Sequence, residues 1–133
     1  MTPDDIAKKL EEFHGHLGPF VAVGWRMGMA ARATLGEGKL RARVFAGPSP
    51  PMSCIVDGVQ VSTSCTLGKG NIWVINAKKP EAEFSSENGS VWIALRKEVA
   101  DRITQDMTKE NERALAMEIL GMPEERLLEV RKQ

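Results

Sequence analysis

The segment over residues 20–35 most constrains the fold of this chain, because it is a helix-length run that is apolar on most sides. Pro19 before it suits the first turn of a helix, and Gly36 after it suits a helix end. A helix without a polar face belongs in the middle of a domain or in an interface. Gly24 and Gly28 are one turn apart, so we expect another backbone to approach this helix closely there.

The rest of the chain alternates helix and strand patterns. Thr2 and Pro3 predict the start of a first helix, which His14 and Gly15 end. Residues 52–65 predict a helix, with a strand as the competing interpretation because apolar residues also alternate there. The other predicted elements are strands over 39–46, 72–76, 82–85 and 90–95, a helix from 106 or 108 to 120, and a last helix from Pro123 that carries Leu127, Leu128 and Val130. We therefore expect one α+β domain over residues 1–133, with an antiparallel sheet packed with helices and a helical tail over 96–133.

Composition narrows the function classes. Lys plus Arg and Asp plus Glu both total 18, so nothing favours nucleic acid as a partner. No apolar run reaches the ~20 residues that a membrane helix needs, and the polar, acidic N-terminus does not resemble a signal peptide. We expect a cytoplasmic protein without a membrane partner. Thiols are reduced in that compartment, so Cys54 and Cys65 are ligands, reactive thiols or core residues rather than a structural disulfide.

Histidine and cysteine side chains are the candidate metal ligands. His14 and His16 flank a glycine, so both reach one ion only from a loop, and nitrogen with thiolate ligands suits zinc. Cys54 and Cys65 are almost three helical turns apart, or ~16 Å, which is too far for one ion unless the helix ends before Cys65 and the chain folds back. The alternative is that the histidines end a helix and the cysteines fill the core.

Two further features are candidates for binding a cofactor or ligand. Asp57 suits a base or a residue that orients a histidine, or a polar position on a helix surface. Lys69, within the glycine-rich stretch TLGKGN (residues 66–71), suggests a phosphate-binding loop. That stretch lacks the complete phosphate-loop pattern, and a turn that shapes the wall of the site is the stronger interpretation.

The order of these segments resembles a known family. FHGHLGPF followed by SCIVDGVQVSTSCTLGKGN is similar to the FmdE domain of formylmethanofuran dehydrogenase and to its stand-alone relatives, over about residues 10–95. The resemblance implies an α+β domain that forms homodimers and binds a metal ion, often zinc. It implies His14 or His16, Cys54 and Cys65 as ligands, with Asp57 and Gln60 lining the site.

This chain departs from the family pattern at Gly18, where many relatives carry a cysteine, and it has no cysteine after residue 65. The leading hypothesis is a zinc-binding domain that acts as a small-molecule or redox-partner module. The alternatives are a metal-dependent enzyme with a His/Cys site, a thiol-redox protein that uses Cys54 and Cys65, and a structural component that docks on a partner through its apolar helix. We expect His16 to be the metal ligand, because it follows Gly15 and is freer to turn, and His14 to support it.

Overall fold

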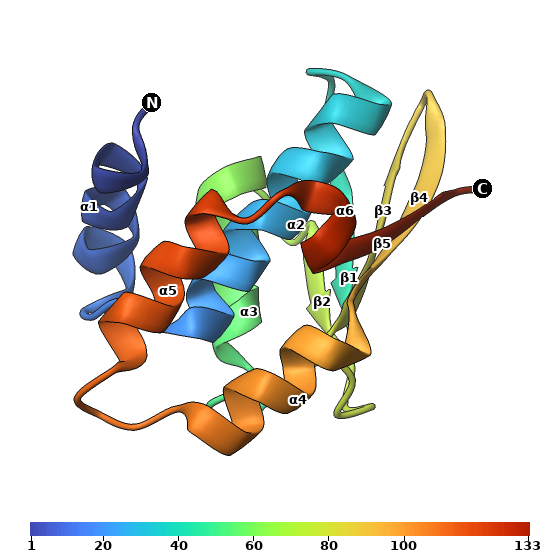
Figure 1. The fold of residues 1–133 in the computed structure, drawn as a ribbon. Helices are drawn as coiled ribbons and strands as arrows, with labels where there is room; N and C mark the ends of the chain where they lie inside the picture. The colour runs from blue at the N-terminus through green and yellow to red at the C-terminus, as the bar shows by residue number, and fades with distance from the viewer.

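The computed structural model describes residues 1–133 (Figure 1). Its helices and strands form a single α+β arrangement, as the sequence pattern predicts. The elements in chain order are α1 (Pro3–His14), α2 (Pro19–Leu35), β1 (Arg41–Val44), α3 (Cys54–Thr63), β2 (Ile72–Val74), β3 (Glu81–Ser86), β4 (Gly89–Leu95), α4 (Lys97–Asp106), α5 (Glu112–Gly121), α6 (Glu124–Leu127) and β5 (Leu128–Lys132). No helix of the structure combines the length and hydrophobicity needed to cross a membrane.

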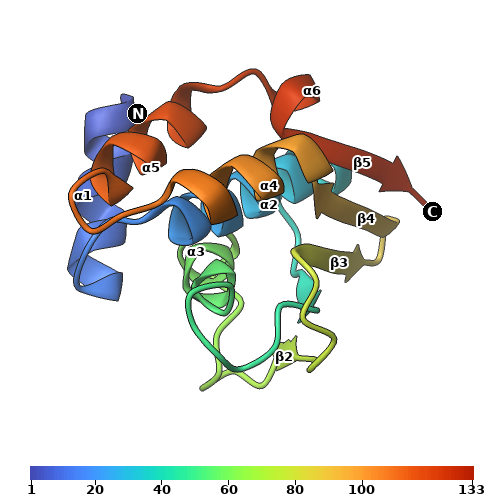
Figure 2. The same ribbon diagram turned by 60° about the horizontal axis from the view of Figure 1, so that its bottom comes forward.

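The five strands form one sheet in the order β2-β1-β3-β4-β5. Pairs β1–β3, β3–β4 and β4–β5 are antiparallel, as the sequence predicts, whereas β1 and β2 are parallel. The parallel pair exists because α3 connects its strands, and only a crossover of that kind returns the chain in the same direction. The helices lie on one side of the sheet (Figures 1 and 2). Ala42 and Val44 accordingly face the core, while Arg41 and Arg43 are exposed.

Helix α2 is the centre of the domain. Its apolar residues are buried on nearly all sides, with Met29 as an exposed exception. It contacts α1, α3, α5 and the sheet within the same chain. The expectation that one such chain leaves this helix uncovered is therefore wrong, because the other helices of the domain supply the covering surface.

Helices α2 and α3 cross at a distance that only glycine permits. A Cβ atom at Gly24 would lie 2.0 Å from the backbone oxygen of Ile55, and one at Gly58 would lie 2.1 Å from that of Val21. A Cβ atom at Gly28 would lie 1.8 Å from Oγ of Ser62. The close approach predicted at Gly24 and Gly28 is thus confirmed. This crossing holds the start of α3 in a defined position beside α2.

The C-terminal part differs from the predicted helical tail. It contains helices α4, α5 and the short α6, but Leu128–Lys132 form strand β5 instead of helix. Leu128 pairs with Leu95 and Val130 pairs with Ile93, which completes the otherwise open edge of β4. The spacing of apolar residues in this short segment fits either structure, and the free sheet edge decides between them.

Arg26 on α2 fastens α5 to the core. Its guanidinium Nη1 donates to the carbonyl oxygens of Ile119 and Met122, each at 2.7 Å, and to that of Leu120 at 3.3 Å. These are carbonyls at the end of α5 that have no partner within the helix. Burial lowers the pKa of Arg26 from its usual value. The position of α5, and of the residue at its start, therefore depends on this buried charge.

Candidate functional site

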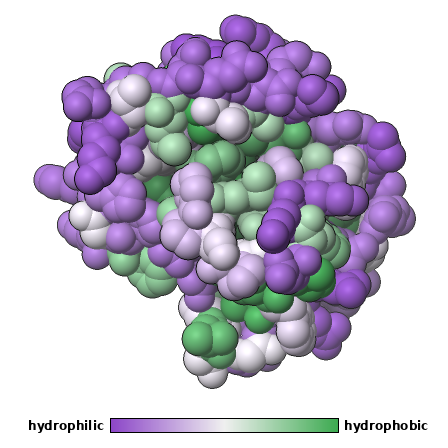
Figure 3. Space-filling model, turned by 90° about the horizontal axis from the view of Figure 1, so that it is seen from below, coloured by the Kyte–Doolittle hydropathy of each residue, from purple (hydrophilic) through white to green (hydrophobic).

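Several helix ends meet at one end of the molecule. The C-terminal end of α1, the first turns of α2, α3 and α5, and the end of α4 gather in the lower part of Figure 1. They enclose a hollow of about 40 Å³, which we call the helix-end pocket and which is lined by His14, His16, Gly18, Pro19, Phe20, Val21, Pro51, Cys54, Met107 and Glu112. Figure 3 views this end from below and shows apolar side chains in the middle of a polar rim.

His14 is the last residue of α1 and its side chain is only 10% exposed. Gly15 follows in the left-handed conformation (φ 93°), which ends the helix and turns the chain toward α2. Nδ1 of His14 lies 2.5 Å from Oδ2 of Asp57 on α3. Because a carboxylate accepts the proton-bearing side of the ring, Nε2 keeps its lone pair. That Nε2 atom is buried and has no hydrogen-bond partner.

Asp57 is itself held in place by the following turn of α3. Nε2 of Gln60 donates to Oδ1 of Asp57 at 3.3 Å, and Oε1 of Gln60 accepts from the backbone N–H of Leu67 at 3.2 Å. The TLGKGN turn is thereby linked through Gln60 and Asp57 to the ring of His14. Both polar residues expected near the site are present, and they act on the histidine from behind rather than from inside the pocket.

His16 and Gly18 form the outer wall of the pocket. The rings of His14 and His16 are 4.6 Å apart between centroids and inclined by 40°. A Cβ atom at Gly18 would lie 3.7 Å from Nε2 of His16 and 3.9 Å from Oε2 of Glu112. Gly18 has an extended backbone (φ −134°, ψ 169°) that any residue adopts. Two potential donor atoms therefore converge on a point where this chain has no side chain.

Cys54 is the first residue of α3 and is half-buried in the pocket wall. Burial raises the pKa of its thiol, and the negative charges of Asp57 and Glu112 raise it further. None of the residues that line the pocket is Lys or Arg. The pocket thus gathers acidic groups without a protein cation to balance them.

Glu112 was not anticipated from the sequence. It is the first residue of α5 and its carboxylate belongs to none of the ion pairs in the structure. An acidic residue in the first turn of a helix is ordinary, so no local signal distinguishes it. It reaches the pocket because α5 packs against α1 and α2.

Cys65 and Lys69 lie apart from the helix-end pocket. The side chain of Cys65 is buried, and its Sγ lies 3.2 Å from the carbonyl oxygen of Leu40. Helix α3 continues to Thr63, so about 14 Å of helix separates Cys54 from the residues that precede Cys65. Both cysteines are free. Lys69 donates through Nζ to the carbonyl oxygen of Ser64 at 2.6 Å, at the end of α3.

The chain therefore does not fold back after α3, and His14, His16 and Cys54 share a pocket that excludes the second cysteine. As the side chains stand, the structure has no group of three or more His, Cys, Asp or Glu residues arranged to hold a metal ion. Nε2 of His14 and the thiol of Cys54 are nevertheless suitable donors, and Nε2 is aligned by a carboxylate in the manner of metal-bound histidines.

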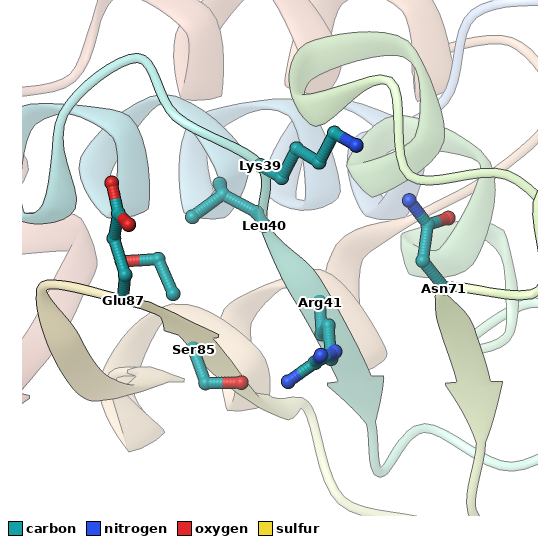
Figure 4. Close-up of a pocket in the computed structure, with 7 residues that line it drawn as sticks. Lys39, Leu40, Arg41, Asn71, Ser85 and Glu87 are labelled. Atoms are coloured by element: carbon teal, nitrogen blue, oxygen red, sulfur yellow. The ribbon is translucent and has the colours of Figure 1, made fainter.

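A larger hollow of about 380 Å³ lies where β1 and β2 begin, lined mostly by polar residues (Figure 4). Lys39, Arg41, Asn71 and Glu87 extend in different directions around it. No unpartnered buried polar atom occurs there, since that of His14 is the one in the structure. The chemistry of the chain is therefore concentrated in the smaller, helix-end pocket.

Comparison with known proteins identifies the family. Residues 13–129 match the model of the FmdE family, described as "Molybdenum formylmethanofuran dehydrogenase operon". A "probable S-adenosyl-L-methionine-binding protein" of Archaeoglobus fulgidus is 40% identical over 75 residues, which are 53% of this chain and only 20% of that protein. The crystal structure of an FmdE-like protein of tungsten formylmethanofuran dehydrogenase from Syntrophus aciditrophicus has the same fold, with a TM-score of 0.77 and 22% identity over 100% of this chain and 72% of that one. The chain belongs to the FmdE family.

Proposed function

We propose that this protein is a metal-binding domain, and that its helix-end pocket binds one divalent ion, with zinc the best-suited metal. Nε2 of His14 and the thiolate of Cys54 are the two donors that the proposal assigns. The observation that carries it is the buried Nε2 atom, which has no partner although Nδ1 is held by Asp57. A buried polar atom without a partner is costly, and a cation at this point satisfies it.

The charges around the pocket support a cation rather than another hydrogen-bond donor. Asp57 and Glu112 both raise the pKa of Cys54, and the pocket has no Lys or Arg to offset them. A divalent ion reverses this effect, because a coordinating thiol loses its proton. When bound, such an ion supplies Lewis acidity and, with few protein donors, positions open to water or a small ligand.

The proposal assigns the ligand role to His14, whereas the sequence favoured His16. His14 has the buried, aligned ring, while His16 is exposed on the outer wall. The backbone freedom of Gly15 turns the chain but leaves the ring of His14 facing α3. His16 is close enough to contribute from the outside, since its ring lies near that of His14.

The size of the pocket restricts what else it binds. A volume of about 40 Å³ accommodates an ion and a water molecule, whereas pockets for larger ligands span about 300–1,000 Å³. S-adenosylmethionine, named for the relative from Archaeoglobus fulgidus, is far too large for it. A small-molecule role for this chain therefore concerns a ligand of a few atoms at the ion.

A thiol-redox role for Cys54 and Cys65 has less support. A disulfide requires Cα atoms within about 7 Å of each other, and helix α3 lies between these two residues. The raised pKa of Cys54 also opposes its use as a free nucleophile with His14 and Asp57, because the thiolate is the reactive form.

Metal analysis tests the proposal directly. The protein purified without added metal, and then titrated with zinc chloride, is expected to bind one ion per chain. His14→Asn and Cys54→Ser should abolish binding, and Asp57→Asn should weaken it about 10- to 100-fold, as for other residues that orient a ligand. Cys65→Ser is the matched control, because it changes the other thiol and keeps a donor for Leu40. No binding by the parent protein, or undiminished binding by Cys54→Ser, would contradict the proposal.

Homodimer formation stays a prediction that rests on the family resemblance. Trp73 and Val74 on the edge strand β2 are about half exposed and offer an apolar surface for it. Sedimentation at micromolar concentration measures the oligomeric state. Sedimentation as a monomer alone would contradict the prediction.

A further inference from the structure

We infer that the carboxylate of Glu112 is a third protein donor to the ion in the helix-end pocket, so that this chain binds metal through nitrogen, sulfur and oxygen. The inference rests on the proposed function. It adds a ligand from α5, an element that lies outside every motif noted in the sequence.

The position of Glu112 is the first argument. Its Oε2 lies 3.9 Å from the point that a Cβ of Gly18 would occupy, and Nε2 of His16 lies 3.7 Å from the same point. Gly18 leaves that space unfilled, so the carboxylate is free to turn inward between His16 and the start of α2. Glu112 and Cys54 line the same small hollow as His14.

The charge of Glu112 is the second argument. Arg113, its neighbour on α5, pairs with Glu11 on α1 at 3.0 Å and is not available to it. The carboxylate instead acts on Cys54, the pKa of which it raises. Two groups that disfavour each other's ionised forms are stabilised together only by a cation between them.

An acidic residue at a helix start has an ordinary structural explanation, since it complements the helix dipole. His14 is the independent observation that points to a ligand. Its side chain is nine-tenths buried, lines the pocket that Glu112 lines, and has an Nε2 atom without a partner. The carboxylate and the imidazole are thus two unsatisfied donors in one pocket.

Carboxylate removal tests the inference on the full chain. Glu112→Gln should lower the affinity for zinc by about tenfold or more, at least the loss seen when an outer residue of a metal site is removed. Glu112→Asp keeps the charge on a shorter side chain and should recover part of the affinity. Glu110→Gln, which removes an exposed acid two residues away that does not line the pocket, should leave affinity unchanged.

Cobalt(II) in place of zinc reports the donor atoms. Glu112→Gln should alter the ligand-field bands while the sulfur-to-cobalt charge-transfer band of Cys54 stays. Adding Gly18→Cys to Glu112→Gln should restore affinity and intensify the charge-transfer band, because a side chain at position 18 meets nothing closer than 3.7 Å. Circular dichroism verifies that each variant is folded.

The outcomes separate this inference from the proposed function. A parent protein that binds no metal overturns both. A parent that binds metal, with Glu112→Gln equal to it in zinc affinity and cobalt spectrum, overturns the role of Glu112 alone and leaves the function proposed for His14 and Cys54.

Discussion

Replacing Gly58 with alanine is expected to destabilise the domain strongly. The new Cβ atom would lie 2.1 Å from the backbone oxygen of Val21, 2.5 Å from the backbone nitrogen of Trp25 and 2.8 Å from the carbonyl carbon of Gly24. These atoms all belong to the backbone of α2, so no side-chain rotation relieves the overlap. The two helices must separate by roughly 1 Å in a core that is packed as densely as a crystal.

The expected cost is about 3 kcal/mol, the upper end of the usual penalty for an added methyl group in a full core. For a domain of this size the midpoint of thermal unfolding should fall by about 10 °C. Because α3 carries both Cys54 and Asp57, we also expect weaker zinc binding by the folded fraction. Urea denaturation followed by circular dichroism and tryptophan fluorescence measures the free energy of unfolding.

Gly121→Ala is the matched control for this prediction. Gly121 is the last residue of α5, and a Cβ atom there would have no neighbour within 4 Å. Alanine at this position should leave stability unchanged or raise it by about 0.5 kcal/mol. A Gly58→Ala variant within about 0.5 kcal/mol of the parent would refute the close-packing argument, because ordinary surface changes stay within that range.

Three further substitutions or reactions test other parts of the structure. Arg26→Met should lower the free energy of unfolding by about 3 kcal/mol, because it removes a charged donor from the buried carbonyls at the end of α5; a loss below about 1 kcal/mol in urea denaturation would contradict this. Leu128→Ala should cost about 2–5 kcal/mol, since this residue of β5 is buried, whereas Leu67→Ala on the exposed turn should cost less than about 0.5 kcal/mol. Equal effects of the two leucine substitutions would argue against β5. In the metal-free protein, alkylation of Cys54 by iodoacetamide should rise with pH only above 9.0, the ordinary value from which its pKa is raised. A midpoint below 9.0 would show that the thiol is not in this environment.

Signals confined to a few residues predicted much of the fold. Thr2 accepts a hydrogen bond from the backbone of Asp5 and begins α1, as its place before Pro3 indicated. Pro19 and Gly36 bound α2 as expected. The Asn88-Gly89 turn connects β3 to β4, in the hairpin that this pair of residues favours.

The candidate site was predictable in part. The motif containing His14 and the motif containing Cys54 and Asp57 were recognisable as chemistry-bearing segments, and the structure brings these residues together. The same reasoning failed for Cys65 and Lys69, because neighbours within a motif separate when a regular helix lies between them. Helix α3 directs its first residue into the pocket, and the chain just beyond its last residue lies toward Leu40.

The sequence by itself determined where the helices of the first half begin and end, the β3–β4 hairpin, and which residues bear the chemistry. Caps and turns are interactions among residues within about four positions, so the local sequence encodes them. Tertiary structure alone decided that Leu128–Lys132 form β5 and that Glu112 reaches the pocket. Both depend on partners far along the chain, the free edge of β4 for the first and the docking of α5 against α1 and α2 for the second. No pattern within either segment specifies such a partner.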